Sequence, residues 1–308
     1  RDSADAEVRR ACWRLVLDET NGVVVAEALT APDPVVRTIA ARHLRAMPIT
    51  PSLRPLLETA ARDGTYAVRR EALGLLLEHF PAAAAPLVEA ALLDLHPVLR
   101  DIAVIDRRRR DPHFDPVAFY LAAIATKRGR ALRAAIAGLG ERATEDCALD
   151  VLPLLGDWRA KVRREAVETL ARLDRESVTP FADALADPSR RVSRAAMLAL
   201  TRRVRGSVIE AALSVGEQAY APAHARAHAL ELIEAARPWD RTLALLRATC
   251  SPTSVWAALA AARVHAYTWV RPTEGELRAV EGALTKARLD PARHDAIARE
   301  IAHWRRTP

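Results

Sequence analysis

Apolar residues recur along this chain in short stretches with helical spacing, and one spacing is repeated. In PVVRTIAARHL (34–44), YAVRREALGLL (66–76) and AKVRREAVETL (160–170), an aliphatic residue, an alanine and a leucine stand at offsets 0, +4 and +8. Offsets of four and eight place side chains on one face of an α-helix. The pattern therefore predicts a set of amphipathic helices, each of which buries one apolar stripe.

The same frame can be placed nine times along the chain, less completely in some places. Its first positions are Val8, Val36, Val68, Leu99, Leu132, Val162, Val192, Ala225 and Val255, at intervals of 28 to 33 residues. Second apolar stretches of helical length lie between them, at 22–30, 86–94, 117–125, 150–155, 180–187 and 242–250. A regular period with two helical stretches indicates a repeat array of antiparallel helix pairs.

Asp-Pro steps suggest where helices of the array begin. They occur at 33–34, 111–112, 187–188 and 290–291. An aspartate can cap a helix N-terminus, and proline suits the first helical position. We therefore expect a helix to start at each of these steps.

The spacing Asp-x-x-Val-Arg-x-x-Ala-x-x-x-Leu, complete at Asp33, Val36, Arg37, Ala40 and Leu44, resembles the HEAT repeat family. The resemblance is closest to the short bacterial HEAT-like repeats of the phycobilin-lyase type, and it covers essentially the whole chain. It implies an all-α fold, a right-handed α-solenoid of about nine antiparallel helix pairs, with the anchored helices on the concave side.

This resemblance leads to expectations about domains. Residues 1–308 are expected to form a single solenoid. The helix at Val8 has no helix before it, so we expect the first repeat to lack its first helix. Residues 272–308 fit the frame only loosely and are predicted to be C-terminal capping helices.

Arginines occupy two kinds of position in the frame. Offset +1, at the edge of the buried stripe, holds Arg9, Arg37, Arg69, Arg100, Arg133, Arg163 and Arg226. In the family this arginine commonly pairs with an acid in a neighbouring turn, and Asp33, Asp63, Asp94 and Asp157 are the candidates here. We interpret these seven arginines as structural.

The offsets opposite the stripe are predicted to form the open, concave face and to bind a partner. Their basic members are Arg10, Arg14, Arg42, Arg45, Arg70, Arg108, Arg109, Arg142, Arg164, Arg172, Arg194 and Arg202. Nine acids share these offsets, among them Glu71 and Asp101, so the face is mixed with a basic excess. A mixed charged face is commonly only a solvated one, and this reading remains open beside partner binding.

The run Arg107 to Arg110 is irregular within the frame. Arg107 stands at offset +8, where most repeats have an aliphatic residue, and it needs an acid such as Asp106 or Asp111. Arg108 and Arg109 belong to the open face, and Arg110 closes the helix, where a cation suits the dipole. We interpret this repeat as a candidate binding or bending point.

The composition gives the chain a basic net charge and argues against a membrane span and disulfide bonds. The net charge is +7 with a pI near 9.9, and 43 of the 46 basic residues are arginine. Such a bias suits carboxylate and phosphate partners, and it also arises from GC-rich coding. No apolar run reaches the roughly 18 residues of a membrane span. Three widely spaced cysteines suggest reduced thiols and a cytoplasmic protein.

Candidate catalytic groups are few. His224 and His228 have the spacing of two metal ligands, but no further ligand motif accompanies them. Asp157 and Trp158, beside Arg159, resemble the tryptophan, aspartate and arginines of the alkylpurine DNA glycosylases, without a residue-by-residue match. A phycobilin-lyase activity has only the repeat behind it.

The favoured prediction is a non-catalytic scaffold that binds a macromolecular partner, preferably a protein with an acidic surface, on its concave face. It needs no metal or cofactor. The first alternative is a nucleic-acid-binding solenoid that uses the arginines of the N-terminal two thirds. The second alternative is a DNA glycosylase-like enzyme. The oligomeric state and the partner's identity are not indicated by the sequence.

Overall fold

The computed structural model describes residues 5–18, 22–203, 205–265 and 269–306, and within these ranges the chain is helical without any strand. The all-α prediction is therefore confirmed. The α-helices are α1 (Ala6–Asp18), α2 (Gly22–Leu29), α3 (Pro34–His43), α4 (Arg54–Ala60), α5 (Tyr66–His79), α6 (Pro81–Ala91), α7 (Pro97–Arg110), α8 (Pro116–Thr126), α9 (Gly129–Arg142), α10 (Ala148–Val151), α11 (Ala160–Leu173), α12 (Thr179–Leu185), α13 (Arg190–Leu200), α14 (Arg205–Glu217), α15 (Ala223–Glu234), α16 (Pro238–Thr249), α17 (Ser254–Ala261), α18 (Glu274–Leu284) and α19 (Pro291–Arg306). Short 3-10 turns at Leu44–Ala46, Pro51–Leu53, Glu145–Cys147 and Leu152–Gly156 complete the set.

The repeat frame corresponds to the odd-numbered helices. All nine frame positions lie on helices, from Val8 on α1 through to Val255 on α17, and the stretches between them form helices too. The stripe is buried as the spacing predicts, since Val36, Ala40 and Leu44 are each 1% exposed or less. Helix pairing at this period is thus confirmed, and the helices define a helical-repeat protein.

The chain divides into two compact units, residues 1–139 and 140–308, which are described separately. The expectation of one continuous solenoid over 1–308, with its capping segment at 272–308, stays a prediction.

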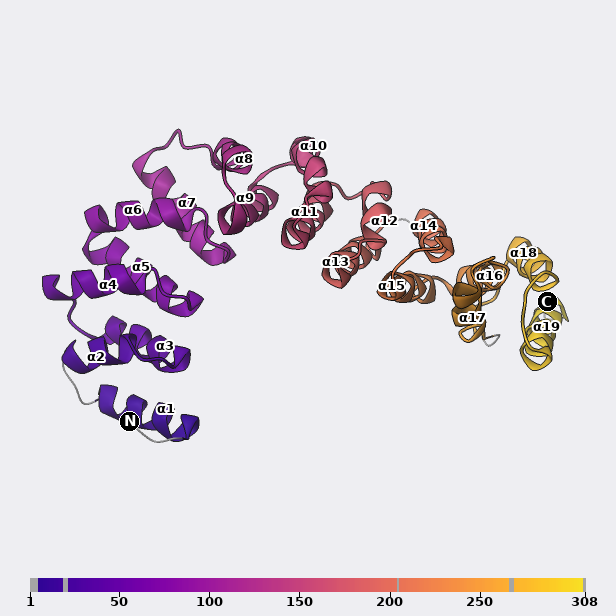
Figure 1. Cartoon of the computed structure of the whole chain (residues 1–308), viewed down its shortest axis with the longest axis horizontal. Helices are drawn as coiled ribbons and strands as arrows, with labels where there is room; N and C mark the ends of the chain where they lie inside the picture. Colours follow the sequence, from indigo (N-terminus) through magenta and orange to yellow (C-terminus); the bar gives the residue numbers. More distant parts are fainter. Residues whose placement is uncertain (1–4, 19–21, 204, 266–268, 307–308) are drawn as a thin grey trace. The chain divides into compact units, whose positions relative to one another are not determined.

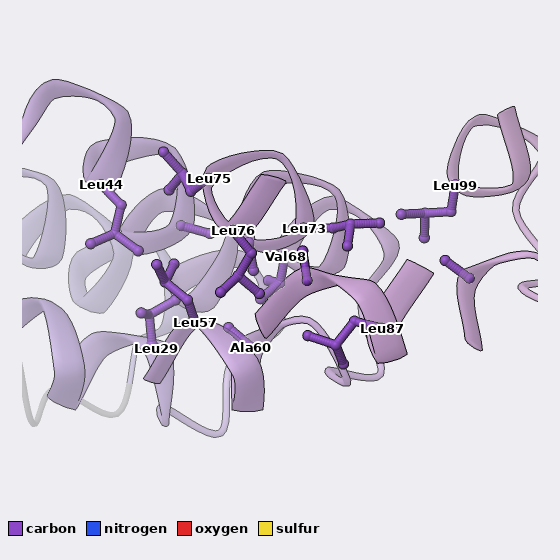
Figure 2. Packing of buried hydrophobic residues seen from close by; sticks show 14 of the residues in the cluster. Leu29, Leu44, Leu57, Ala60, Val68, Leu73, Leu75, Leu76, Leu87 and Leu99 are labelled. Carbon is purple, nitrogen blue, oxygen red and sulfur yellow. The ribbon is translucent and has the colours of Figure 1, made fainter. Parts of the chain in front are cut away.

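In the first unit, α3 and α5 each pack on the helix before them and on the previous anchored helix, and α7 packs on α6. Helix α3 packs on α2 and α1, and α5 packs on α4 and α3, as Figure 1 shows for this unit. Figure 2 shows the leucines of this core, where Leu57 of α4 lies close to Leu76 of α5. Burial of such aliphatic side chains stabilises the fold by roughly 1.5–3 kcal/mol each.

The second unit is built in the same way. Helices α11, α13 and α15 pack in succession, and α12, α14, α16 and α18 form the row behind them. Two aromatic rings, those of Phe181 and Trp256, are almost completely buried in this unit. Stacking of like helices within each unit is the arrangement expected of a helical repeat.

The predicted helix starts were only partly right. Asp33 caps α3 by accepting from the backbone N–H of Val35, and Pro34 is its first residue. The step at 111–112 was wrong, because Asp111 closes the turn after α7 and Asp115 caps α8. At 187–188 the helix begins two residues later, at Arg190.

Candidate partner-binding surface

Three of the seven edge arginines, Arg37, Arg69 and Arg163, hold neighbouring repeats together as predicted. Arg37 donates to the Asp63 carboxylate at 2.8 Å and to the carbonyl oxygens of Ala31 and Pro32. Arg69 repeats this pattern with Asp94. A guanidinium group has five donors, so it can serve one carboxylate and two carbonyls at once.

The second unit contains the same ladder with a different acid. Arg163 pairs with Asp187 at 2.7 Å and donates to the carbonyl oxygens of Asp157 and Trp158. Asp157, expected to be a ladder acid, instead pairs with Arg159 at 2.7 Å. Arg226 uses only backbone carbonyls. The guanidinium groups of Arg163 and Arg226 are therefore engaged in contacts within the fold.

The twelve arginines predicted to bind a partner are divided between the two units. Eight are exposed, namely Arg14, Arg42, Arg45, Arg108, Arg109, Arg172, Arg194 and Arg202. Four are half-buried, namely Arg10, Arg70, Arg142 and Arg164. Arg10 departs from expectation because it pairs with Asp33 at 3.0 Å and so takes the structural position expected of Arg9. Arg164 lies 3.4 Å from Glu168 on its own helix.

Glu71 brings two of these arginines together in the first unit. Its side chain is only 3% exposed, although its offset predicted an open-face acid, and both Arg45 and Arg70 pair with it. The side chain of Arg45 nevertheless remains 56% exposed and that of Arg70 39% exposed. A buried carboxylate thus fixes two cations of neighbouring helices at the surface. We call Arg45, Arg70 and Glu71 the arginine clamp.

Charge and hydrogen bonding keep Glu71 ionised. Burial alone would raise the pKa of Glu71, but hydrogen bonds from Arg70 and Arg45 outweigh it and hold the pKa below its ordinary value. The pKa of Arg70 is raised by its bond to Glu71. The clamp therefore carries one net positive charge, with unused guanidinium N–H groups that can donate to a carboxylate or phosphate.

Aromatic rings support the clamp from one side. Tyr66 stacks on His96 with ring centroids 3.2 Å apart, and the Arg70 guanidinium lies 5.9 Å from the centre of the Tyr66 ring. A planar guanidinium over an aromatic face is attracted by the ring quadrupole. These contacts restrict Arg70 to one orientation.

The four-arginine run divides as the frame predicts, with one addition. Arg107 pairs with Asp111 at 3.2 Å and also with Glu89 of α6 at 3.1 Å. Asp106, the other acid considered for Arg107, pairs with Arg110. Arg108 and Arg109 are exposed and form no ion pair with a described residue. They are the two members of the run available to a partner.

Both histidines of the pair lie within hydrogen-bond distance of other groups of the fold. The Nδ1 of His228 lies 2.8 Å from the buried Ser193 hydroxyl, and the His224 Nε2 lies 3.0 Å from the backbone oxygen of Asp187. In the described ranges no group of three or more histidine, cysteine or acidic side chains could hold a metal ion. The three cysteines are free thiols.

The aspartate considered for glycosylase chemistry is committed to local structure. Hydrogen bonding from the Arg159 side chain, with a further bond from its backbone N–H, holds the pKa of Asp157 below its ordinary value. Trp158 beside it is 85% exposed on a turn. The enzyme alternative stays a prediction.

Neither a protein-family model nor a curated protein matches the chain. Among solved structures, 39 chains match. One belongs to a structure described as showing that Kap95p binding induces the switch loops of RanGDP to adopt the GTP-bound conformation. Identity to that chain is 13%, the TM-score is 0.49, and the match covers 98% of this chain and 48% of that one. This chain thus spans about half the length of the structure it matches.

None of the described helices of this protein is long and apolar enough to cross a membrane.

Proposed function

We propose that this protein is a non-catalytic scaffold of the HEAT-like type that binds an acidic protein partner on the open face of its anchored helices. The observation that carries the proposal is the arginine clamp. Two half-exposed arginine side chains, Arg70 of α5 and Arg45 of the 3-10 turn that follows α3, are held in place by a carboxylate that is itself buried. Burial of an acid costs several kcal/mol unless the acid is paired, and an apolar side chain at position 71 would avoid that cost. Stability alone therefore does not explain the arrangement.

The neighbouring surface of the same unit is also basic. Arg42 on α3 and Arg108 and Arg109 on α7 are exposed, and no described acid pairs with them. Such cations can form charge-assisted hydrogen bonds with carboxylates at little cost in desolvation, since they begin in water. An acidic protein surface matches this distribution of charge, and the HEAT-like repeat supplies an extended face to hold it.

The first prediction tests the clamp by capture of partners from the native cell extract. The purified chain is immobilised as the wild type, as Arg45→Ser/Arg70→Ser/Glu71→Leu, which removes both cations without leaving an unpaired buried acid, and as Arg278→Ser, which removes the same net charge from an exposed site on α18. Each capture is carried out with and without nuclease. We expect an acidic protein that survives nuclease treatment and is lost only from the clamp variant.

Two outcomes would contradict the proposal. Equal capture by the clamp variant and the Arg278→Ser control, whether retained or lost in both, would mean that the clamp does not determine binding. Loss of the captured protein after nuclease treatment would instead favour the nucleic-acid alternative, in which the same arginines contact phosphates.

A further inference from the structure

Three anchored helices of the second unit begin at one edge. Helices α11, α13 and α15 pack side by side (Figure 1). Their N-terminal ends are joined, because Arg163 on α11 pairs with Asp187 at 2.7 Å and His224 on α15 contacts the Asp187 backbone oxygen at 3.0 Å. The turns that precede these helices therefore lie in a row.

Two of these turns carry aromatic rings that are almost fully in solvent. Trp158, in the turn before α11, is 85% exposed, and Tyr220, in the turn before α15, is 99% exposed. Burial of a large aromatic side chain on folding is normally favourable, so two such rings left in water are available for an intermolecular contact.

The two turns are rigid although their rings are exposed. Arg163 donates to the carbonyl oxygens of Asp157 and Trp158 at 2.7 and 3.1 Å. In the same manner, Arg226 donates to the carbonyl oxygens of Gln218 and Ala219 at 2.8 and 3.2 Å. Each ring is thus presented on a backbone that a half-buried (Arg163) or buried (Arg226) arginine holds, and little backbone entropy of the turns remains to be lost on binding.

Cations lie between the two rings. Lys161 in the first turn of α11 and Arg190 and Arg191 in the first turn of α13 are exposed, and none pairs with a described acid. Cations near a helix N-terminus are unfavourable for the helix itself, because the dipole is positive at that end. The unpaired cations and the positive ends of the helix dipoles both favour the binding of an anion at this edge.

The acids of this edge do not cancel the charge. Asp157 pairs with Arg159, and Asp187 pairs with Arg163. Glu217, at the end of α14, is exposed. Five cations therefore face three acids. The Arg159 guanidinium also lies 5.3 Å from the centre of the Trp158 ring, on one of its faces.

We propose that this aromatic edge, defined by Trp158, Lys161, Arg190, Arg191 and Tyr220, binds single-stranded nucleic acid. A single strand offers phosphates and unstacked planar bases in alternation, so one polymer satisfies both the cations and the rings. An acidic peptide satisfies only the cations, and in a duplex the base faces are already stacked. The inference is separate from the proposed function, which concerns arginines of the first unit.

The length of the aromatic edge determines the length of the oligonucleotide that tests it. Packed helices are roughly 8–10 Å apart, so Trp158 and Tyr220, two repeats apart, are separated by about 20 Å. At about 3.4 Å per stacked nucleotide this corresponds to about six nucleotides. Fluorescein-labelled oligothymidine and oligouridine of about twelve nucleotides, and a duplex of the same length, are therefore titrated with the full chain by fluorescence anisotropy.

The salt dependence and the aromatic variants give the second prediction. Three phosphate contacts give a slope of log Kobs against log salt of about −2, and Arg190→Ser/Arg191→Ser reduces it to about −0.7. Trp158→Ala and Tyr220→Ala each weaken binding about 5- to 150-fold without changing the slope. Binding tighter to oligouridine identifies RNA as the natural class, and binding tighter to oligothymidine identifies DNA.

Matched controls separate the edge from general basicity. Trp269→Ala removes another exposed tryptophan of the same unit, and Lys286→Ser/Arg299→Ser removes two exposed cations elsewhere in it. Both should bind as the wild type does. The proposal is overturned if Trp158→Ala and Tyr220→Ala retain wild-type affinity, if the duplex binds as tightly as the single strands, or if the control pair lowers the slope equally. It is also overturned if a polyglutamate peptide binds with the same losses on aromatic substitution.

Discussion

At the scale of single residues, arginine performs two roles in this chain, and position in the helical frame separates them. Offset +1 predicted structural arginines, and Arg37, Arg69 and Arg163 fulfil the prediction with carboxylate and carbonyl partners. The frame failed for Arg10, which pairs with Asp33. Val8, the first frame position of this helix, is also 47% exposed, so the first helix departs from the frame in a way that side-chain offsets alone do not reveal.

Glu71 shows a second limit of sequence reasoning. Its offset predicted a solvated acid, yet it is buried under Arg45 and Arg70. Arg45 comes from the end of a different helix, so the clamp depends on how α3 and α5 stack. A periodic pattern describes one helix at a time and contains no information about that contact.

His228 leads to the third prediction. Its ring is buried, and because the Ser193 hydroxyl donates to the Leu185 carbonyl at 2.7 Å, the His228 Nδ1 must donate to Ser193. Burial lowers the pKa of His228. Near it, Glu231 opposes this shift, whereas His224, Arg190 and Arg194 reinforce it.

The sign of the pH effect follows from linkage. The unfolded chain binds the His228 proton below a pH of about 6.5, whereas the folded chain binds it only at lower pH. Stability from the neutral ring is complete above that pH and is lost as pH falls through the interval between the two pKa values. The slope is about 1.4 kcal/mol per pH unit at most. Below the folded pKa the loss stops.

The measurement is urea unfolding of the wild type and His228→Gln at several pH values between 7.5 and 5, roughly the range in which histidine titrates. We expect the free-energy difference between the two proteins to shrink as the pH falls below about 6.5. Other groups titrate equally in both proteins and cancel in the difference. A difference independent of pH would mean that His228 does not lose stability by protonation.

At the scale of helices, the sequence predicted the existence of the helices more accurately than the residues at which they begin. Nine frame positions fall on nine helices because burial of one stripe requires the 3.6-residue period. The steps at 111–112 and 187–188 failed as helix starts because an aspartate can cap a turn as readily as a helix. Asp111 and Asp187 both accept from the backbone N–H two residues later, the geometry of such turns.

Glycine permits one close helix contact that gives the fourth prediction. Gly216 on α14 lies under the buried ring of Trp256 on α17, and a Cβ added there would be 2.1 Å from that ring. In Gly216→Ala the rigid indole must move, which costs about 1–3 kcal/mol and outweighs the roughly 1 kcal/mol gained in helix propensity. We expect a lower urea midpoint with an unchanged m-value.

Gly206→Ala is the matched control, because Gly206 lies on the same helix with nothing within 4 Å of an added Cβ. It should be neutral or slightly stabilising. If Gly216→Ala were equally harmless, α14 and α17 would be packed less closely than the structure shows.

At the scale of the molecule, each unit is a series of repeats that contact mainly their neighbours. The ladder contacts join one repeat to the next, as between Arg37 and Asp63 or between Arg163 and Asp187. In such arrays stability is approximately a sum of repeat and interface contributions. A local defect should therefore have local consequences.

Arg37→Ala tests this directly and is the fifth prediction. The substitution removes the partly buried 2.8 Å pair with Asp63, the partly buried bond to the Ala31 carbonyl and the exposed bond to the Pro32 carbonyl, at a cost of about 2–3 kcal/mol to the interface of α3 and α5. By hydrogen exchange, amide protection in these two helices should fall roughly 30- to 150-fold, while α11 to α16 exchange as in the wild type. Arg42→Ala, which removes an exposed arginine of α3 without an ion pair to any described residue, should change neither region. If protection instead fell throughout both units, the chain would unfold as one cooperative body rather than as neighbouring repeats. If it fell nowhere, the ladder would contribute orientation but no stability.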